Sequence, residues 1–442
     1  MLSLFLQKLK TCIQLNKNIK NKMTVIINAT YSKAPSATED GILGIRLLGN
    51  SPITRPIHIG LVLDTSGSME GPRIHAVKKT LAVLIDKLAE DDKISVVGFA
   101  NEARVLLRSH VITADNKATT IDTVNLLEAE GGTNMECGIV ALGSSLGEEM
   151  PDAVVLLTDG QVNQGIITAA GLSSVIRSYL QAVPVYTLGY GEDHNAELLK
   201  SLSSRTQGTY TYVNNELVLP ESVGDLLGGL QSEVAKAATI LFPETWTCLE
   251  LIPVEKPGEY QIGSLIADKP TWVMFKVPAG SAVDSETTIR YKDCVSSELY
   301  TKSCVFDGAL DVLDITEQEL RCQTARTLEE IGTMLQQGAF RGAKMKLNVM
   351  LDFLNASVSS RRPLVIHMKA QIEEMIEDVK RMEMGTPDRR QITAMAMRTT
   401  SLGANYSAQR GVTGGGAVFS SPRQRDTQAQ MVTQYTQEDP AV

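Results

Sequence analysis

The sequence predicts an α/β domain with a doubly wound, mainly parallel sheet, inserted into a β-sandwich and followed by a helical segment. Three observations lead to this fold class. Between residues 56 and 232, continuous apolar runs alternate with segments of helical periodicity, as in strands that are buried on both faces of a parallel sheet. Short strands separated by turn residues dominate 233–312. Helical periodicity then returns over 313–384.

Length and composition are those of an ordinary globular protein. The chain has 442 residues, enough for two or three domains, with 43% hydrophobic and 21% charged residues. Its 42 basic and 51 acidic residues give a net charge of −9. This balance argues against nucleic-acid binding as the main function, because phosphate contacts require clustered Lys and Arg.

Residues 1–22 are interpreted as an N-terminal extension that need not be translated, because strand-like sequence starts directly after Met23. The apolar run at 2–6 is too short for a secretory signal peptide. Its one-sided apolar face leaves a membrane-surface or transit helix as the alternative. The chain contains no run of 18 apolar residues. We therefore expect a cytoplasmic protein without membrane attachment.

Two strands, over 24–32 and 42–49, form the first part of the sandwich at 23–55. They have no obvious partners unless they pair with strands that follow the α/β domain. This predicts that the α/β domain, 56–232, is an insertion whose two ends lie close together. Within it, helices are expected near 116–127, 135–148, 169–181, 195–204 and, last, 217–235.

The remaining sandwich strands are predicted at 238–243, 247–253, 259–265, 270–277, 287–294 and 299–305, within a segment 233–312. The helical segment, 313–384, contains three expected helices over 316–337, 342–356 and 363–383. Residues 385–442 are rich in Ser, Gln, Thr and Gly and have few apolar anchors, so this tail is expected to be largely disordered.

Cysteine and histidine spacing argues against a zinc module. None of the six cysteines forms a CxxC pair, and the five histidines make no short-spaced metal pattern. Cys294 and Cys304 could form a disulfide across a hairpin. Unpaired thiols in a reducing compartment are the preferred interpretation.

The segment Asp64-Thr-Ser-Gly-Ser68 directly follows the first buried strand of the α/β domain. Ligands of open α/β sheets bind at this carboxyl end of the strands. Asp64, Ser66 and Ser68 alternate along a tight loop in which Gly67 permits the bend, so their oxygens can face one point. Carboxylates and hydroxyls are hard donors that suit Mg²⁺, Mn²⁺ or Ca²⁺.

Two further loops complete the candidate metal site. Thr133 lies in the glycine-supported segment GGTN, and Asp159 follows another buried strand in LLTDGQ. Strands in the middle of such a sheet end side by side, so these loops should meet at one crevice. Taken singly, each segment has a structural explanation, as a helix cap or a turn. All five residues together favour a metal site.

The motifs DTSGS, GGT and TDG, in this order, resemble the von Willebrand factor type A (vWA) domain with a complete metal-ion-dependent adhesion site. The resemblance extends through PIHIGLVLDTSGSMEG and KISVVGFA to vWA proteins of protists and plants. The segment to about residue 310 is similar to their β-rich region after the vWA domain. Some of those proteins carry a RING or Hint module, but this chain has the residue pattern of neither.

The resemblance implies a role for each motif residue. Ser66 and Ser68 would ligate the metal directly, Thr133 directly or through water, and Asp64 and Asp159 mainly through water. A sixth position would remain for an Asp or Glu of a protein partner, because a cation held largely by neutral hydroxyls stays electrophilic. The surrounding rim, which would tune specificity, is expected to comprise Met69, Glu70, Asn134, Gln161 and Asn163.

The function expected from these features is divalent-cation-dependent protein binding, as a module or scaffold without enzymatic activity. The alternative is a metal-dependent hydrolase or a subunit of an enzyme complex, such as an adaptor of a ubiquitin ligase. The sequence places no His or Lys beside the metal loops as a general base, although Glu70 could serve. It leaves open the oligomeric state and whether the last helix of the domain switches affinity.

Overall fold

A computed structural model describes residues 24–50, 55–147, 149–160, 162–191, 194–206, 208–215, 217–250, 256–282, 287–294, 296–306, 310–385, 387, 389–408 and 420–437. The chain divides into two compact units. One is built from the chain before Pro56 together with 232–248 and 254–310. The other contains 56–231, 249–253 and the chain after Leu310. The predicted N-terminal extension, residues 1–22, lies outside the described residues.

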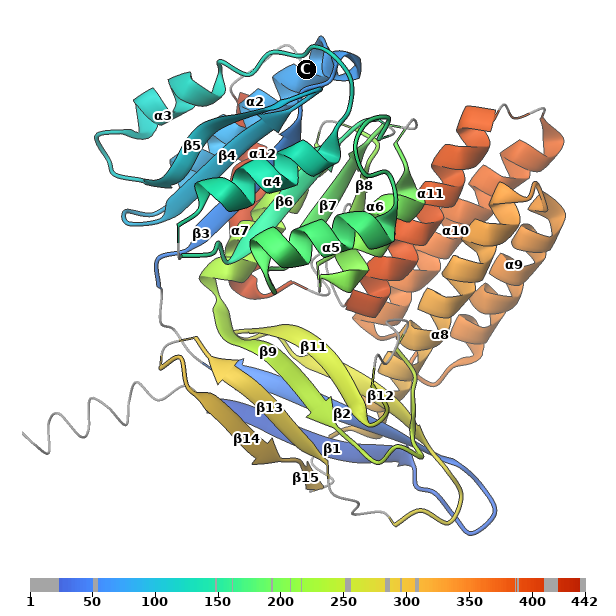
Figure 1. Cartoon of the computed structure of the whole chain (residues 1–442). Helices are drawn as coiled ribbons and strands as arrows, with labels where there is room; N and C mark the ends of the chain where they lie inside the picture. Colours follow the sequence, from blue (N-terminus) through green and yellow to red (C-terminus); the bar gives the residue numbers. More distant parts are fainter. Residues whose placement is uncertain are drawn as a thin grey trace, which may run out of the picture. The chain divides into compact units, whose positions relative to one another are not determined.

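A six-stranded sheet forms the centre of the second unit (Figure 1). All neighbouring strands pair in parallel except the edge strand β5, which is antiparallel to β4. In spatial order, the strands are β5 (Ala103–Val111), β4 (Lys93–Phe99), β3 (His58–Asp64), β6 (Ala153–Thr158), β7 (Val185–Tyr190) and β8 (Tyr210–Val213). The predicted doubly wound, mainly parallel sheet is confirmed.

Helices cover both faces of this sheet because its strands are apolar on both sides. Leu61 and Leu63 of β3 pack into one hydrophobic cluster, and Val62 between them packs into another. The first cluster includes side chains of α2 (Pro72–Lys87), α3 (Lys117–Val124) and α7 (Val218–Gln231). The second includes side chains of α4 (Met135–Ser145), α5 (Ala169–Leu180) and α6 (Ala196–Arg205).

The last helix of the domain is shorter than predicted. The sequence favoured a helix over 217–235, but α7 ends at Gln231 and strand β9 (Glu233–Leu241) begins two residues later. Pairing of β9 with β11 (Glu259–Ile266) places Glu233 and Ala235 in a β ladder. Local helix propensity is therefore overridden by tertiary strand pairing.

The first unit consists of two layered sheets (Figure 1), between which the rings of Phe242 and Phe275 lie 4.7 Å apart. One sheet has the order β10 (Thr247–Cys248), β12 (Thr271–Val277), β2 (Gly41–Asn50), β1 (Thr24–Lys33) and β15 (Val305–Phe306). The other has the order β11, β9, β13 (Thr288–Asp293) and β14 (Leu299–Ser303).

The α/β segment is inserted in this sandwich, as predicted from the two unpaired N-terminal strands. Strands β1 and β2 precede the insertion, and β2 pairs with β12, which follows it. The strand predicted at 247–253 is largely absent among the described residues, since only Thr247–Cys248 is extended in a ladder. Glu250 instead lies buried in an ion pair with Arg321 of the second unit.

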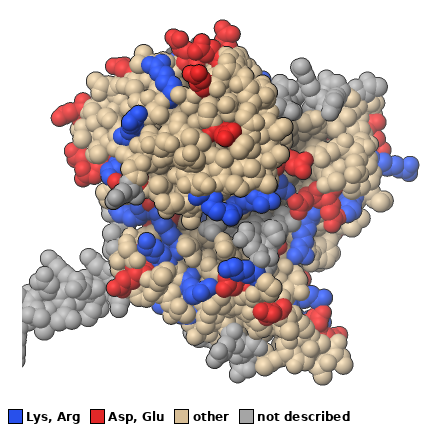
Figure 2. Space-filling model, viewed as in Figure 1, with Lys and Arg blue, Asp and Glu red and all other residues tan. Residues whose placement is uncertain are grey.

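The C-terminal helices α8 (Val312–Gln336), α9 (Phe340–Ala356) and α10 (Pro363–Met384) occur where helical periodicity predicted them. Apolar side chains of all three helices form a common core. The helices pack against one another (Figure 1). No helix among the described residues is long and apolar enough to cross a membrane. Figure 2 shows both acidic and basic side chains on this face of the molecule, with Asp and Glu gathered at the upper edge of the α/β domain.

The expectation of a largely disordered tail after residue 384 is wrong for most of that segment. It contains α11 (Arg389–Ala408) and α12 (Pro422–Gln437). Met395 and Tyr406 of α11 are buried in the core of the helical segment, and Met431 and Tyr435 of α12 are buried in the core of the α/β domain. A few apolar side chains suffice here because each helix docks on a surface that is already built.

Candidate functional site

The first loop of the site is anchored at the carboxyl end of β3, in the centre of the sheet. The backbone N–H of Thr65 donates to the carbonyl of Phe99 at the end of β4, at 2.8 Å. Within the loop, the N–H of Ser66 donates to Asp64 Oδ1 at 2.8 Å. The hydroxyl of Thr158, the last residue of β6, donates to Asp64 Oδ2. Both oxygens of Asp64 are thus fixed by their neighbours.

Backbone hydrogen bonds hold the three predicted loops together. The N–H of Gly67 donates to the carbonyl of Gly131 at 3.0 Å, which joins the first loop to the GGT segment. Thr133 is joined to the third loop twice. Its carbonyl accepts from the N–H of Asn163 at 3.1 Å, and its N–H donates to Asn163 Oδ1 at 3.0 Å.

Side-chain oxygens from the three loops lie near one another. Ser66 Oγ and Ser68 Oγ lie 3.0 Å apart, and Ser68 Oγ donates to Asp159 Oδ1 at 2.7 Å. A methyl group built on Gly160 would lie 3.4 Å from Thr133 Oγ1 and 3.6 Å from Ser68 Oγ. The hydroxyls of Thr133 and Ser68 therefore lie on the same side of Gly160.

Most of the five candidate metal ligands are buried, and this burial affects the pKa of Asp64. Asp64 and Asp159 are both fully buried, Ser66 and Thr133 are almost fully buried, and Ser68 is exposed. Burial raises the pKa of the Asp64 carboxyl, and the charge of Asp159 adds to this effect. The hydrogen bonds from Ser66 and Thr158 act in the opposite direction.

These residues fit a hard divalent cation. Two carboxylates and three hydroxyls supply only oxygen donors, the class that Mg²⁺, Mn²⁺ and Ca²⁺ prefer. Two buried acidic groups beside one another are costly unless a cation compensates them. The described residues hold no group of three or more His, Cys, Asp or Glu placed for a metal.

The predicted rim is only partly realised. Met69 is fully buried in the core of the α/β domain, so its side chain does not line the opening. Glu70 and Asn163 are exposed. Asn134 caps α4, because its side chain accepts from the N–H of Cys137 at 3.3 Å. Gln161 lies outside the described residues.

Sequence reasoning did not identify two polar residues of the site. Thr158 holds Asp64, and the guanidinium of Arg73 forms an ion pair with Asp159. Arg73 also donates to the carbonyl of Ser68 at 3.4 Å. A signal for Arg73 was available, because it lies in the first turn of α2, where a cation opposes the helix dipole and needs another partner.

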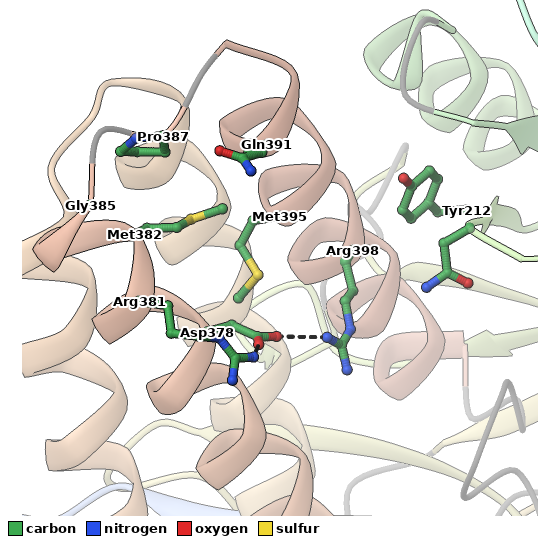
Figure 3. A pocket seen from close by; sticks show the side chains of 10 residues that line it. Tyr212, Asp378, Arg381, Met382, Gly385, Pro387, Gln391, Met395 and Arg398 are labelled. Carbon is green, nitrogen blue, oxygen red and sulfur yellow. Dashed lines mark hydrogen bonds and ion pairs between the residues drawn. The ribbon is translucent and has the colours of Figure 1, made fainter.

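A separate cavity of about 580 Å³ lies between β8 and the C-terminal helices (Figure 3). Arg398 donates to Asp378 at 2.8 Å and pairs with Glu374 at 2.6 Å, and Arg381 also pairs with Asp378. These charges compensate one another, so the cavity offers no oxygen-rich cation site comparable to the one described above. Its lining residues are Tyr212, Asn214, Asp378, Arg381, Met382, Gly385, Pro387, Gln391, Met395 and Arg398.

Comparison with known proteins agrees with the fold. Residues 58–224 match the sequence model of the von Willebrand factor type A domain. An uncharacterized protein of Synechocystis sp. is 32% identical over 164 residues, which cover 36% of this chain and 38% of that protein. Human inter-alpha-trypsin inhibitor heavy chain H4 is 23% identical over 326 residues, which cover 69% of this chain and 34% of that protein. The matches thus span little more than a third of these relatives.

A solved structure resembles nearly the whole described architecture. The von Willebrand factor type A protein from Catenulispora acidiphila aligns over 86% of this chain and 96% of its own, with a TM-score of 0.63 and 18% identity. At this identity the likeness concerns the fold. The particular similarity to protist and plant proteins stays a prediction. The sequence match and the fold together identify residues 58–224 as a von Willebrand factor type A domain.

Proposed function

We propose that this protein is a divalent-cation-dependent binding module or scaffold that captures an acidic side chain of a protein partner. The observation that carries the proposal is the convergence of Ser66, Ser68 and Thr133 with two buried carboxylates at the carboxyl edge of the sheet. Mg²⁺, Mn²⁺ or Ca²⁺ held there would supply a Lewis-acidic centre for an incoming carboxylate.

The difference in exposure among the site residues indicates the side from which a partner would approach. Ser68 is exposed, while Asp64 and Asp159 are fully buried beneath it. Asn163 is also exposed and fixes the backbone of Thr133. A carboxylate that reaches the exposed hydroxyl of Ser68 meets a neutral donor, while Asp64 and Asp159 stay buried.

The test of metal binding compares the wild type with Asp64→Ala/Ser66→Ala by titrating Mn²⁺ and Mg²⁺ in a calorimeter. We expect binding by the wild type and at least a hundredfold loss in the double variant, because a buried carboxylate and a hydroxyl donor are removed. Asp122→Ala/Ser174→Ala is the matched control, since it removes the same groups from exposed helical positions. Wild-type protein that binds neither ion would refute the proposal.

Capture of a partner is tested by pull-down from the native host with Mg²⁺ or with chelator. The proposal requires a set of partners that is retained only with Mg²⁺ and is lost in Asp64→Ala/Ser66→Ala. Identical capture by both proteins under both conditions contradicts it. Thermal melting in chelator shows separately that each variant is folded.

The hydrolase alternative needs a general base beside the metal loops. His194 follows the neighbouring strand β7, but its Nδ1 lies 2.7 Å from the carbonyl of Gly191 and its Nε2 lies 2.8 Å from the hydroxyl of Tyr210. Both ring nitrogens are therefore engaged in the fold. This arrangement favours binding without turnover, and metal-dependent release of p-nitrophenol from phosphate or acetate esters, lost in Asp64→Ala, would favour the alternative.

A further inference from the structure

Arg73 brings a fixed positive charge into the candidate metal site. It stands in the first turn of α2, four residues after the buried Met69 that ends the short helix η1 (Gly67–Met69). Its guanidinium forms an ion pair with the fully buried Asp159 and donates to the carbonyl of Ser68. A methyl group built on Gly191, after β7, would lie 3.3 Å from Arg73 Nη2.

The position of Arg73 is unfavourable for the helix alone. The amino end of α2 carries the positive end of the helix dipole, and its first turn contains no acidic residue. A cation at this point is stabilised only by what it contacts outside the helix. The buried carboxylate of Asp159 supplies that compensation, so the pairing is the reason that an arginine is tolerated there.

The charged side chains of the candidate metal site can be counted. Asp64 and Asp159 contribute two negative charges when ionised, and Arg73 contributes one positive charge. A bound divalent cation would therefore leave the group with one net positive charge. Without Arg73 the same group would be neutral. A neutral site gains less from an anionic ligand than a positive one does.

We propose that Arg73 is a specificity-determining residue that weakens binding of the divalent cation and strengthens capture of the partner's carboxylate. This inference rests on the proposed function of the same site. Arg73 competes with the metal for the charge of Asp159, since both interact with one carboxylate. Once the metal is bound, the remaining positive charge selects a negatively charged ligand over its amide counterpart.

The experiment measures Mn²⁺ affinity of the full chain by calorimetry for the wild type, Arg73→Gln, Arg73→Met and Arg73→Lys. We expect both neutral variants to bind Mn²⁺ at least tenfold more tightly than the wild type, and Arg73→Lys to stay within about threefold. Arg177→Gln removes an equal charge from the exposed side of α5 and should leave the Mn²⁺ affinity unchanged. Unfolding in chelator verifies the fold of each variant.

A second measurement uses acetate as the probe on the Mn²⁺-saturated proteins, with acetamide as its neutral counterpart. Acetate should bind the wild type more tightly than it binds Arg73→Gln or Arg73→Met, by about fivefold or more. Acetamide should bind the wild type and the two neutral variants with similar affinity.

The outcomes separate the two hypotheses. If wild-type protein binds no Mn²⁺, the proposed function fails. If wild-type protein binds Mn²⁺ but neither neutral variant binds it more tightly, the inference about Arg73 is overturned while the proposed function stands. Should one neutral variant fail to fold, the other decides. Equal acetate binding by the wild type and the folded neutral variants overturns the claim about ligand selection.

Discussion

Asn163 illustrates how a residue beside the metal loops can act through another residue. Its side chain and its backbone both bond the backbone of Thr133, at 3.0 and 3.1 Å. Thr133 carries one of the hydroxyls that face Gly160. Asn163 thus orients the hydroxyl of Thr133, a candidate metal ligand, without being a ligand itself.

Asn163→Ala should therefore lower Mn²⁺ affinity by about ten- to a hundredfold, the range typical of residues that orient metal ligands. Calorimetry with the full chain measures this change. Gln164→Ala is the matched control, because that exposed side chain bonds Asn101 rather than Thr133. Equal affinities of both variants would show that Thr133 holds its position without Asn163.

His58 provides a pH-dependent contribution to stability at the start of β3. Burial lowers its pKa from the ordinary value of 6.5, although nearby Glu149 and Asp152 act in the opposite direction. The unfolded chain binds a proton near pH 6.5, whereas the folded protein stays neutral to lower pH. The unfolded state then holds more protons, so stability decreases as the pH falls below 6.5.

His58→Gln should reduce this loss of stability between pH 7.5 and pH 5, by about 1.4 kcal/mol for each unit by which the pKa is lowered. Urea unfolding across that range gives the free energy of unfolding. His75→Gln, which makes the same replacement at an exposed position of α2, is the matched control. The same slope in wild type and His58→Gln would exclude His58 as the source.

Among the elements, α12 depends on two glycines of α7. A methyl group on Gly224 would lie 2.8 Å from the Cα of Gln428, and one on Gly228 would lie 2.7 Å from the Cα of Gln424. The two backbones can approach this closely only without side chains between them. Gln424 adds a hydrogen bond to the carbonyl of Asp225 at 3.2 Å.

Gly228→Ala should destabilise the protein by about 1–3 kcal/mol, because the added methyl group meets backbone that cannot move freely. Thermal and urea unfolding measure this loss. Gly342→Ala in α9 is the control, since its nearest contact is the flexible tip of Met334. There the gain in helix propensity, up to about 1 kcal/mol, should make the change neutral or stabilising. A stabilising Gly228→Ala would contradict the close packing of α12.

The elements that the sequence predicted best are those with strong periodicity. The apolar runs that became β3 and β6 need no partner to be recognised, and the motif residues follow them directly. Helix α12 was not predicted because Met431 and Tyr435 become an apolar anchor only against α7. Arg73 and Thr158 were not predicted as site residues for a related reason, since the residues that they contact lie on other strands and loops.

At the scale of the whole molecule, a buried ion pair fixes segment 249–250 against the C-terminal helices. Arg321 and Glu250 are paired through two bonds of 2.9 and 2.6 Å, and the side chains of both are at most 1% exposed. Arg321 also donates to the carbonyl of Tyr406 in α11 at 2.9 Å. One guanidinium thus connects three stretches of chain.

Glu250→Gln should lower the free energy of unfolding by about 3–5 kcal/mol, because it removes the carboxylate that is paired with the buried guanidinium of Arg321. The double variant Glu250→Gln/Arg321→Met should recover part of this loss, since no lone charge remains. Glu329→Gln breaks a partly exposed pair with Lys200 and should cost no more than about 1 kcal/mol. Urea unfolding measures the free energy of unfolding of each variant. Similar losses of stability for Glu250→Gln and Glu329→Gln would show that burial does not make the pair of Glu250 more important.

The insertion of the α/β domain has a consequence for the order of events during synthesis. Leu47 of β2 pairs with Thr271 of β12, and Asn28 of β1 pairs with Val305 of β15. The first two strands therefore leave the ribosome long before their neighbours exist, while the α/β sheet between them can already assemble. Until those neighbours are made, the outer edges of β1 and β2 lack the strands that they pair with in the folded protein, and open strand edges favour association with other chains.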